Sequence, residues 1–177
     1  MKKILIQVDG SNFYNKVKTL LPKSHLTLFN YLDFVNFISK GSPNNIIYYV
    51  GEIRRTRNNK KSELLYSSQQ SLFLNLRKQN VTIKLGYLLF SSGKFHEKGV
   101  DVQIAVDMVK GAIKNEYDTC YLISSDTDLL PAIKIAREEK KKIIYVGFEK
   151  AESRALIKNC SSSLILKKED ILPFAKK

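Results

Sequence analysis

Histidine and cysteine are scarce in this chain, with two residues of each among 177. Cys120 and Cys160 stand far apart and form no CxxC pair, and only His25 and His96 are available to join them at a metal. Structural zinc sites use four such ligands at short spacings, so this composition speaks against one. We expect both cysteines to be buried and reduced.

Long apolar runs are absent as well. No segment approaches the roughly 18 apolar residues of a membrane span. The amino terminus passes from two lysines into a strand-like segment without a signal-peptide cleavage pattern. With 44% hydrophobic residues, the chain has the composition of a globular protein, and we expect a single domain over residues 1–177, located in the cytoplasm.

Two common phosphate-binding signatures are also missing. The chain contains neither GxGxxG nor the P-loop ending GK[ST]. The segment DGSN, which follows the first apolar run, lacks the second Asp that haloacid-dehalogenase-type phosphatases carry two residues after their nucleophile. A phosphatase or another nucleotide-handling enzyme is therefore a weak alternative for this sequence.

Acidic residues are outnumbered by basic ones. The chain has 30 Lys and Arg against 17 Asp and Glu, a formal net charge of +13 and a pI near 9.7. A field of this sign attracts polyanions, and nucleic acid is the commonest large polyanion in a cytoplasm. Lysine-rich surfaces also occur in AT-rich bacterial proteomes without any such role. The charge favours a nucleic-acid partner and leaves a solvated basic surface as the alternative.

Strand-like and helix-like segments alternate along the chain. Continuous β-branched or aromatic runs predict strands at 4–8, 46–50, 81–90, 121–123, 142–148 and 162–166. Apolar residues three and four apart predict helices at 13–21, 28–39, 61–79, 102–113 and 126–140, with short helices near 151–159 and 169–174. A polar loop is expected at 91–99. This alternation predicts an α/β fold with a mostly parallel central sheet.

The helix predicted at 102–113 carries its own expectations. Its core-facing side is predicted to consist of Val102, Ala105, Val106, Val109 and Ile113. Asp101 stands at the start and is expected to cap the helix. Asp107 lies roughly 240° further round the helix than Asp101, so the two share no face. A structural salt bridge or a supporting role suits Asp107 better than metal binding.

Acids follow the predicted strands at several points. Asp9 ends the first strand, Asp126 and Asp128 follow the strand at 121–123, and Asp101 opens a helix. Because strand-to-helix junctions of a parallel sheet point to one edge, we expect these four carboxylates to converge there. Helix capping is the structural alternative for each of them, and Ser125 or Asp126 suits that role.

A cluster of four carboxylates needs cations to offset its charge. Oxygen ligands without His or Cys suit Mg²⁺ or Mn²⁺, which activate water and stabilise the oxygens of a phosphodiester displacement. We expect Asp9 and Asp126 as direct ligands. Asp101 is expected as a third ligand or a water-orienting acid, and Asp128 as a fourth ligand or a supporting partner.

Other polar residues accompany the predicted acidic edge. Asn12 either orients a metal-bound water or a phosphate, or caps the first helix, a role that Ser11 also suits. The loop GEIRRTRNNKKS leaves the strand at 46–50 and should emerge at the same edge. Its cations suit phosphate oxygens, with a solvated loop as the alternative. The predicted nucleic-acid-binding residues are Arg54, Arg55, Arg57, Lys60 and Lys61.

Three motifs occur in a distinctive order: DGSNFY at 9–14, KGVDVQIAVDMV at 98–109 and SSDTDLLPAIKIAREEKKKIIYVG at 124–147. Together they resemble the NYN family, specifically its LabA-like branch within the PIN-like nuclease superfamily, over roughly residues 1–150. The resemblance implies a PIN-like Rossmannoid three-layer α/β/α sandwich and a metal-dependent ribonuclease site. The family's acidic positions carry over to Asp9, Asp101, Asp126 and Asp128, with Asn12 and Asp107 as accessory matches.

The sequence thus favours a Mg²⁺- or Mn²⁺-dependent endoribonuclease acting on single-stranded or structured RNA. The alternative is an RNA-binding or regulatory module that keeps the nuclease fold and its acids but turns over little. Apolar helix faces also leave a homodimer open.

Overall fold

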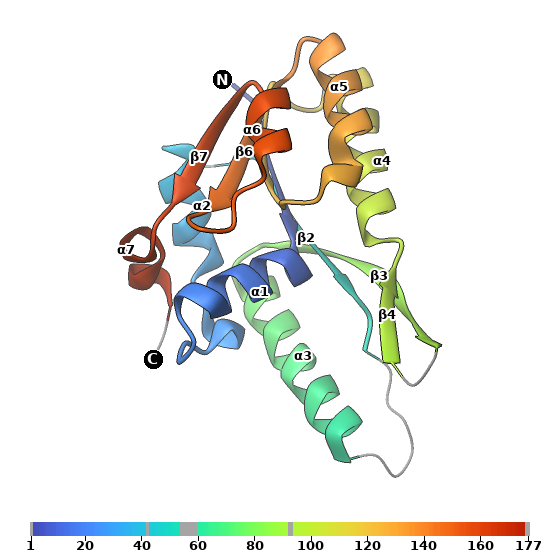
Figure 1. Ribbon diagram of the computed structural model, residues 1–177, viewed down its shortest axis with the longest axis vertical. Coiled ribbons are helices and arrows are strands. Elements are labelled where there is room, and N and C mark those ends of the chain that lie inside the picture. The colour runs from blue at the N-terminus through green and yellow to red at the C-terminus, as the bar shows by residue number, and fades with distance from the viewer. Residues whose placement is uncertain (1, 42, 54–59, 92–93, 176–177) are drawn as a thin grey trace.

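Figure 1 shows the computed structural model, which describes residues 2–41, 43–53, 60–91 and 94–175. Within these residues seven strands form one sheet in the order β4-β3-β2-β1-β5-β6-β7. All neighbouring strands are parallel except β3 and β4, which form an antiparallel pair. The strands are β1 (Ile4–Asp9), β2 (Asn45–Gly51), β3 (Thr82–Ser91), β4 (Lys94–Lys98), β5 (Thr119–Ile123), β6 (Lys142–Phe148) and β7 (Ser162–Leu166).

Helices connect the parallel strands and cover both faces of the sheet. They are α1 (Gly10–Leu20), α2 (Tyr31–Ser39), α3 (Lys60–Lys78), α4 (Val100–Ile113), α5 (Leu130–Glu138), α6 (Arg154–Asn159) and α7 (Lys168–Ile171), with 3-10 turns η1 (Leu26–Leu28), η2 (Thr127–Leu129) and η3 (Leu172–Phe174). The predicted three-layer α/β/α sandwich with a mostly parallel sheet is confirmed. In the described part of the chain no helix has both the length and the apolar character needed to cross a bilayer.

The core consists of two clusters, one on each face of the sheet. Alternate residues of a strand point to opposite faces, so Ile6 and Val8 of β1 pack with α1, α2, α3 and α7. Leu5 lies in the other cluster, with α4, α5 and α6. Gln7 and Asp9 alternate with Ile6 and Val8 and therefore share the α4 side of β1.

The segment 91–99 differs from its prediction as a polar loop. Ser91 still belongs to β3, and residues 94–98 form the edge strand β4, which pairs with β3 from Tyr87↔Lys98 to Ser91↔Lys94. Charged residues suit a solvent-facing edge strand, so the sequence KFHEK lacks the usual apolar strand pattern. The resulting hairpin extends β3 beyond its partner β2 (Figure 1).

Helix α4 also differs from its prediction in two respects. Its N-cap is Gly99 with φ +82°, and Asp101 lies in the first turn, so the expected cap is wrong by two residues. The expected core face is wrong for three of its five residues, because Val102, Val106 and Ile113 are 66%, 52% and 63% exposed. Ala105 and Val109 are partly buried and pack against the core, as expected. The fully buried residues of α4 are Val100, Ile104, Met108 and Ala112.

Candidate active site

Asp9 lies at the carboxyl end of β1, where the strand order of the sheet reverses. Strand β1 pairs with β2 on one side and β5 on the other, and such switch points are where α/β sheets bind ligands. Asp9 caps α1, because its Oδ1 accepts the N–H of Asn12 at 3.0 Å. The cap is thus Asp9 itself, and neither Asn12 nor Ser11, two residues that had suited that role, occupies it.

A glycine makes the turn at Asp9 tight. A Cβ at Gly10 would lie 2.7 Å from the carbonyl oxygen of Tyr49 and 2.4 Å from the ring of Tyr48. The Tyr48 hydroxyl also donates to the Gly10 carbonyl at 3.3 Å. Only a residue without a side chain fits there, so α1 begins directly against β2 and holds the Asp9 carboxylate at the sheet edge.

Ser124 links Asp9 to the acids that follow β5. The register Val8↔Ile123 places Ser124 beside Asp9, one residue past the end of β5. The Ser124 hydroxyl donates to Asp9 Oδ2 at 2.8 Å and accepts the N–H of Asp126 at 3.2 Å. Asp9 and Ser124 are 5% and 1% exposed. A buried hydroxyl therefore joins the two strand ends.

Asp126 and Asp128 occupy the turn beyond Ser124. Asp126 caps η2 by accepting the N–H of Asp128 at 2.9 Å, so the capping alternative for this acid is confirmed, while metal binding by it stays a prediction. Asp126 is half-buried, whereas Asp128 is exposed. Helix α4 contacts β1, β2 and η2, and exposed Asp101 lies in its first turn at the same edge of the sheet.

The donor set at this edge suits a hard cation by its chemistry. Asp9, Asp101, Asp126 and Asp128 offer carboxylate oxygens, which Mg²⁺ and Mn²⁺ prefer. Hydrogen bonds through Ser124 and the backbone connect three of the four acids. Within the described ranges, no three His, Cys, Asp or Glu side chains form a group arranged to hold an ion. The residue types fit a metal, while the arrangement is that of a hydrogen-bonded network.

Asp107 takes part in a separate network that fixes α4. Its carboxylate accepts hydrogen bonds from Tyr49 at 2.9 Å, from Gln103 at 3.1 Å and from Lys84 at 2.7 Å, the last being an ion pair. Gln7 donates in turn to the Tyr49 hydroxyl at 2.8 Å, and burial raises the pKa of Tyr49 above its ordinary range. The predicted structural salt bridge of Asp107 is confirmed.

Comparison with known proteins assigns the family. The model of the NYN domain matches residues 3–167, nearly the whole chain. The chain belongs to the NYN domain family. NYN domains have the PIN-like nuclease fold, so the motifs that contain Asp9, Asp101 and Asp126 belong to a domain with a nuclease fold.

Two further proteins resemble this NYN domain. An uncharacterized protein from Methanocaldococcus jannaschii is 42% identical over 57 residues, which span 32% of this chain but only 24% of that protein. A crystal structure of a protein of unknown function from Vibrio parahaemolyticus superposes with a TM-score of 0.69. It is 20% identical, and the match covers 99% of this chain and 96% of the other, so the likeness supports the fold.

Sequence reasoning missed Tyr145, which holds a residue of the loop after β5 at the carboxyl edge of the sheet. Its hydroxyl lies 3.0 Å from the hydroxyl of Ser125 and accepts the N–H of Ser153 at 3.0 Å. Tyr145 is buried within β6, in a run that shows only the pattern of a core strand. No sequence signal distinguished it, because its role depends on which loop covers the end of β6. Ser125 is thereby held by β6 and does not cap η2.

Some of the predicted basic residues are described by the structure, and an exposed aromatic residue lies near the start of α4. Lys60 and Lys61 begin α3 and are exposed, whereas the predicted Arg54, Arg55 and Arg57 lie outside the described residues. Sequence reasoning also missed Tyr87, which is 51% exposed. It pairs with exposed Lys98, and its ring would lie 3.2 Å from a Cβ at Gly99, the residue that caps α4. An aromatic surface thus borders the helix that carries Asp101.

Proposed function

We propose that this NYN domain, of the LabA-like branch, is a metal-dependent endoribonuclease of the cytoplasm that uses residues 1–177 as one unit. The observation that carries the proposal is the network Asp9–Ser124–Asp126 at the switch point of the sheet, with Asp101 on the adjoining helix. Family membership and the four motif acids support hydrolysis of phosphodiester bonds at this edge.

In the proposed mechanism the chain's own residues hold the reacting groups. Asp9, fixed by Ser124 and the start of α1, and half-buried Asp126 would be the direct ligands of Mg²⁺ or Mn²⁺. A bound ion supplies positive charge and lowers the pKa of water. Exposed Asp101, in the first turn of α4, would orient a water molecule or complete the ligand set, and Asp128 of η2 would be a fourth ligand or a supporting partner. Asn12, in the first turn of α1 beside Asp9, is the proposed amide contact to a metal-bound water or to the scissile phosphate.

RNA is the proposed substrate, in single-stranded or structured form. The net charge of +13 and exposed Lys60, Lys61 and Lys98 favour contact with phosphates. The exposed ring of Tyr87 offers a base-stacking surface beside the acidic edge, which suits an unpaired nucleotide. Arg54, Arg55 and Arg57 remain predicted phosphate contacts.

The test is cleavage of a labelled single-stranded RNA by wild type and by Asp126→Asn, each with Mn²⁺, with Mg²⁺ and with EDTA. An Asn oxygen still accepts the N–H of Asp128, so the fold should persist while the charge is lost. We expect wild type to cleave only with metal and Asp126→Asn to lose about 100-fold or more in rate. Glu139→Gln, at an exposed carboxylate that ends α5 on the opposite edge of the sheet, is the matched control and should cleave like wild type.

A regulatory RNA-binding module is the second candidate. It is favoured by the hydrogen bonds that connect the acids within the described residues, where no three-ligand group is preformed. RNA that is bound but left intact in every lane would support this module. Equal cleavage by wild type and Asp126→Asn would instead contradict the carboxylate mechanism.

A further inference from the structure

The carboxyl-terminal half of β3 has an exposed face. Lys84 and Gly86 face α4, because the lysine pairs with an acid of that helix and a Cβ at the glycine would lie 2.7 Å from a side chain there. Leu85 and Tyr87 alternate with these residues and therefore lie on the opposite face. On that face Ile83 packs against the core cluster that includes α3, whereas Leu85 and Tyr87 are 47% and 51% exposed. Two large side chains thus meet solvent where the core ends.

Two glycines fix Tyr87 beside the start of α4. Gly99 has φ +82°, a left-handed conformation at the turn from β4 into the helix. A Cβ at Gly99 would lie 3.2 Å from the ring of Tyr87. A Cβ at Gly86 would lie 2.7 Å from the carbonyl oxygen of Lys98, so the end of β4 lies tightly on β3. The ring of Tyr87 therefore lies beside the residue two positions before Asp101.

A positive charge accompanies the ring. Lys98 pairs directly with Tyr87 in the antiparallel hairpin, and residues paired in this way share a face. Lys98 is exposed and forms no ion pair among the residues that the structure describes, whereas Lys84 is paired with Asp107. Leu85, Tyr87 and Lys98 are called here the β3 platform. They place an apolar side chain, an aromatic ring and an uncompensated cation on one surface.

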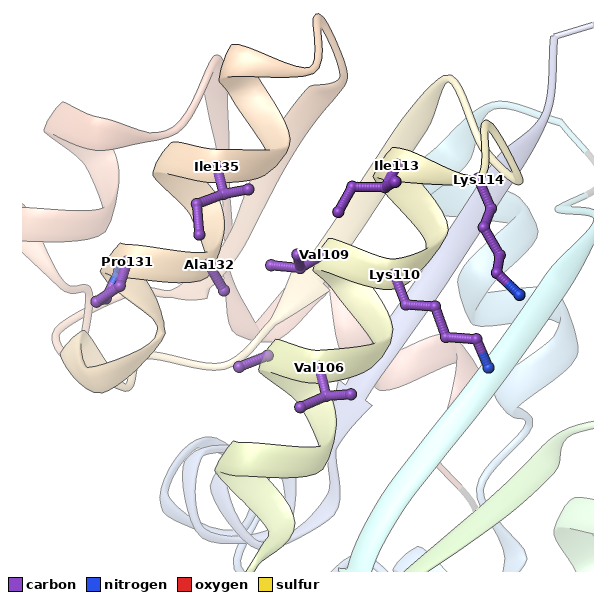
Figure 2. Close-up of a pocket in the computed structure, with 9 residues that line it drawn as sticks. Val106, Val109, Lys110, Ile113, Lys114, Pro131, Ala132 and Ile135 are labelled. Carbon is purple, nitrogen blue, oxygen red and sulfur yellow. The ribbon is translucent and has the colours of Figure 1, made fainter.

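The groove between α4 and α5 has a different chemistry. Figure 2 shows Val106, Val109 and Ile113 of α4 along this groove of about 560 Å³. Lys110 and Lys114 also line it, but their side chains point away from α5. None of its described lining residues is aromatic, so the groove offers no ring on which a base could stack. The β3 platform is the surface that combines a ring with a free cation.

We infer that the β3 platform binds an unpaired strand of RNA, an inference that rests on RNA as the proposed substrate. Aromatic rings stack on bases that are splayed out of a helix, and bases within a duplex are already stacked on each other. The Lys98 ammonium suits a phosphate of the same strand. Because Tyr87 lies at the start of the helix that carries Asp101, a nucleotide stacked there is close to the acidic edge. Tyr87 is thereby a specificity-determining residue for unpaired RNA.

The first experiment measures binding of a short labelled RNA to the full chain by fluorescence anisotropy, in EDTA, where the proposed cleavage cannot occur. Tyr87→Ala should weaken binding of the unpaired strand about tenfold, and binding of the same strand paired with its complement less than about twofold. Tyr87→Phe keeps the ring and should bind like wild type. Phe37→Ala, at a 48% exposed aromatic residue of α2, and Val106→Ala, in the groove of Figure 2, are matched controls and should also bind like wild type. Circular dichroism must show all variants equally folded.

An abasic strand separates base stacking from a general disturbance of β3. It keeps the sugars and phosphates of the RNA and lacks its bases. On this strand Tyr87→Ala should bind within about twofold of wild type, because the variant has no stacking left to lose. Lys98→Gln should instead weaken binding of every strand, and it should reduce the dependence of log affinity on log salt by about 0.7 for the unpaired strand.

Equal binding of the unpaired strand by wild type and Tyr87→Ala would overturn the inference. Failure of wild type to bind any strand, or an equal loss for Tyr87→Ala on the abasic strand, would do the same. A domain that cleaves RNA and ignores Tyr87→Ala would contradict the β3 platform alone. A domain that binds unpaired RNA through Tyr87 but cleaves nothing would contradict the proposed activity alone.

Discussion

At the scale of single residues, Ser124 is the side chain on which the acidic edge depends. Its hydroxyl is nearly inaccessible and serves two partners, donating to Asp9 and accepting the N–H of Asp126. Ser124 lies outside the strands predicted at 4–8 and 121–123. Its role follows from the register of β1 with β5, which cannot be derived from the sequence alone. A neutral hydroxyl thus determines how two acids on different loops face each other.

Replacing Ser124 by Ala should therefore destabilise the fold. The Asp9 carboxylate would lose a charge-assisted donor in a buried position, and we expect the free energy of unfolding to fall by about 1.5–3 kcal/mol. Urea denaturation measures this difference. Ser163→Ala, at an exposed position of β7, should change stability by less than about 0.5 kcal/mol. A loss for Ser124→Ala as small as that of the control would show that the hydrogen bond contributes little.

At the scale of elements, α4 is fixed to the sheet by a polar contact as well as by its apolar side. Asp107 receives hydrogen bonds from β2, from β3 and from its own helix. The spacing of apolar residues did not select the inner side of α4, because two sides satisfy it equally. The hydrogen bonds of Asp107 select the inner side, because an acid that accepts from buried Tyr49 of β2 and pairs with Lys84 of β3 has to face the sheet.

The variant Asp107→Ala should loosen this contact. It would leave the Tyr49 hydroxyl buried without its acceptor and Lys84 without its partner, so we expect a loss of about 2–3 kcal/mol in the free energy of unfolding. Hydrogen exchange of α4 amides should rise in parallel. Glu63→Ala, at an exposed acid of α3, is the comparison and should leave both measurements unchanged. Unchanged exchange in α4 would mean that its apolar side alone holds it.

At the scale of the whole molecule, buried cysteine thiols and tyrosine hydroxyls limit the stability of the fold at high pH. Burial raises the pKa of the Cys160 thiol from 9.0 to about 11 and raises the pKa values of Cys120, Tyr49 and Tyr117 further. The folded state then keeps protons that the unfolded state releases. The stability that each group contributes is fully present below its unfolded pKa, 9.0 for the thiols and 10.0 for the tyrosines. It is lost as the pH rises from that value to the folded pKa, by at most about 1.4 kcal/mol per pH unit for each group.

The unfolding temperature should therefore fall between pH 9 and pH 11. A scanning series across this range measures the slope for wild type and for Cys160→Ala. The variant should start lower, because it loses packing, but decline less steeply, because one titrating group is gone. Parallel slopes would exclude Cys160 as a contributor. Both thiols should also resist alkylation in the native state, in line with the confirmed expectation of buried, free cysteines.

The architecture of the molecule was largely predictable, whereas its edges were not. The parallel core strands carry continuous apolar runs, with Asp9 as the last residue of β1 and Asp126 three residues past the end of β5. The sheet and the position of these two acids at its edge therefore follow from local patterns. Strand β4 was missed because an edge strand can carry charged residues and then lacks the apolar pattern by which strands are predicted. The position of Asp101 relative to α4 was missed because the left-handed conformation of Gly99 starts the helix early. Ligand binding by the four acids stays a prediction.

The place of β1 in the middle of the sheet has a consequence during synthesis. This strand is made first, yet one of its two neighbours, β5, follows it by more than a hundred residues, and the bond between Ser124 and Asp9 spans 115 positions. A nascent chain that has emerged only as far as β3 carries β1 with one side unpaired. Closing so long a loop is slow. Most of the domain must therefore leave the ribosome before its acidic edge can form. A chain truncated before β5 would contain Asp9 without Ser124 and Asp126.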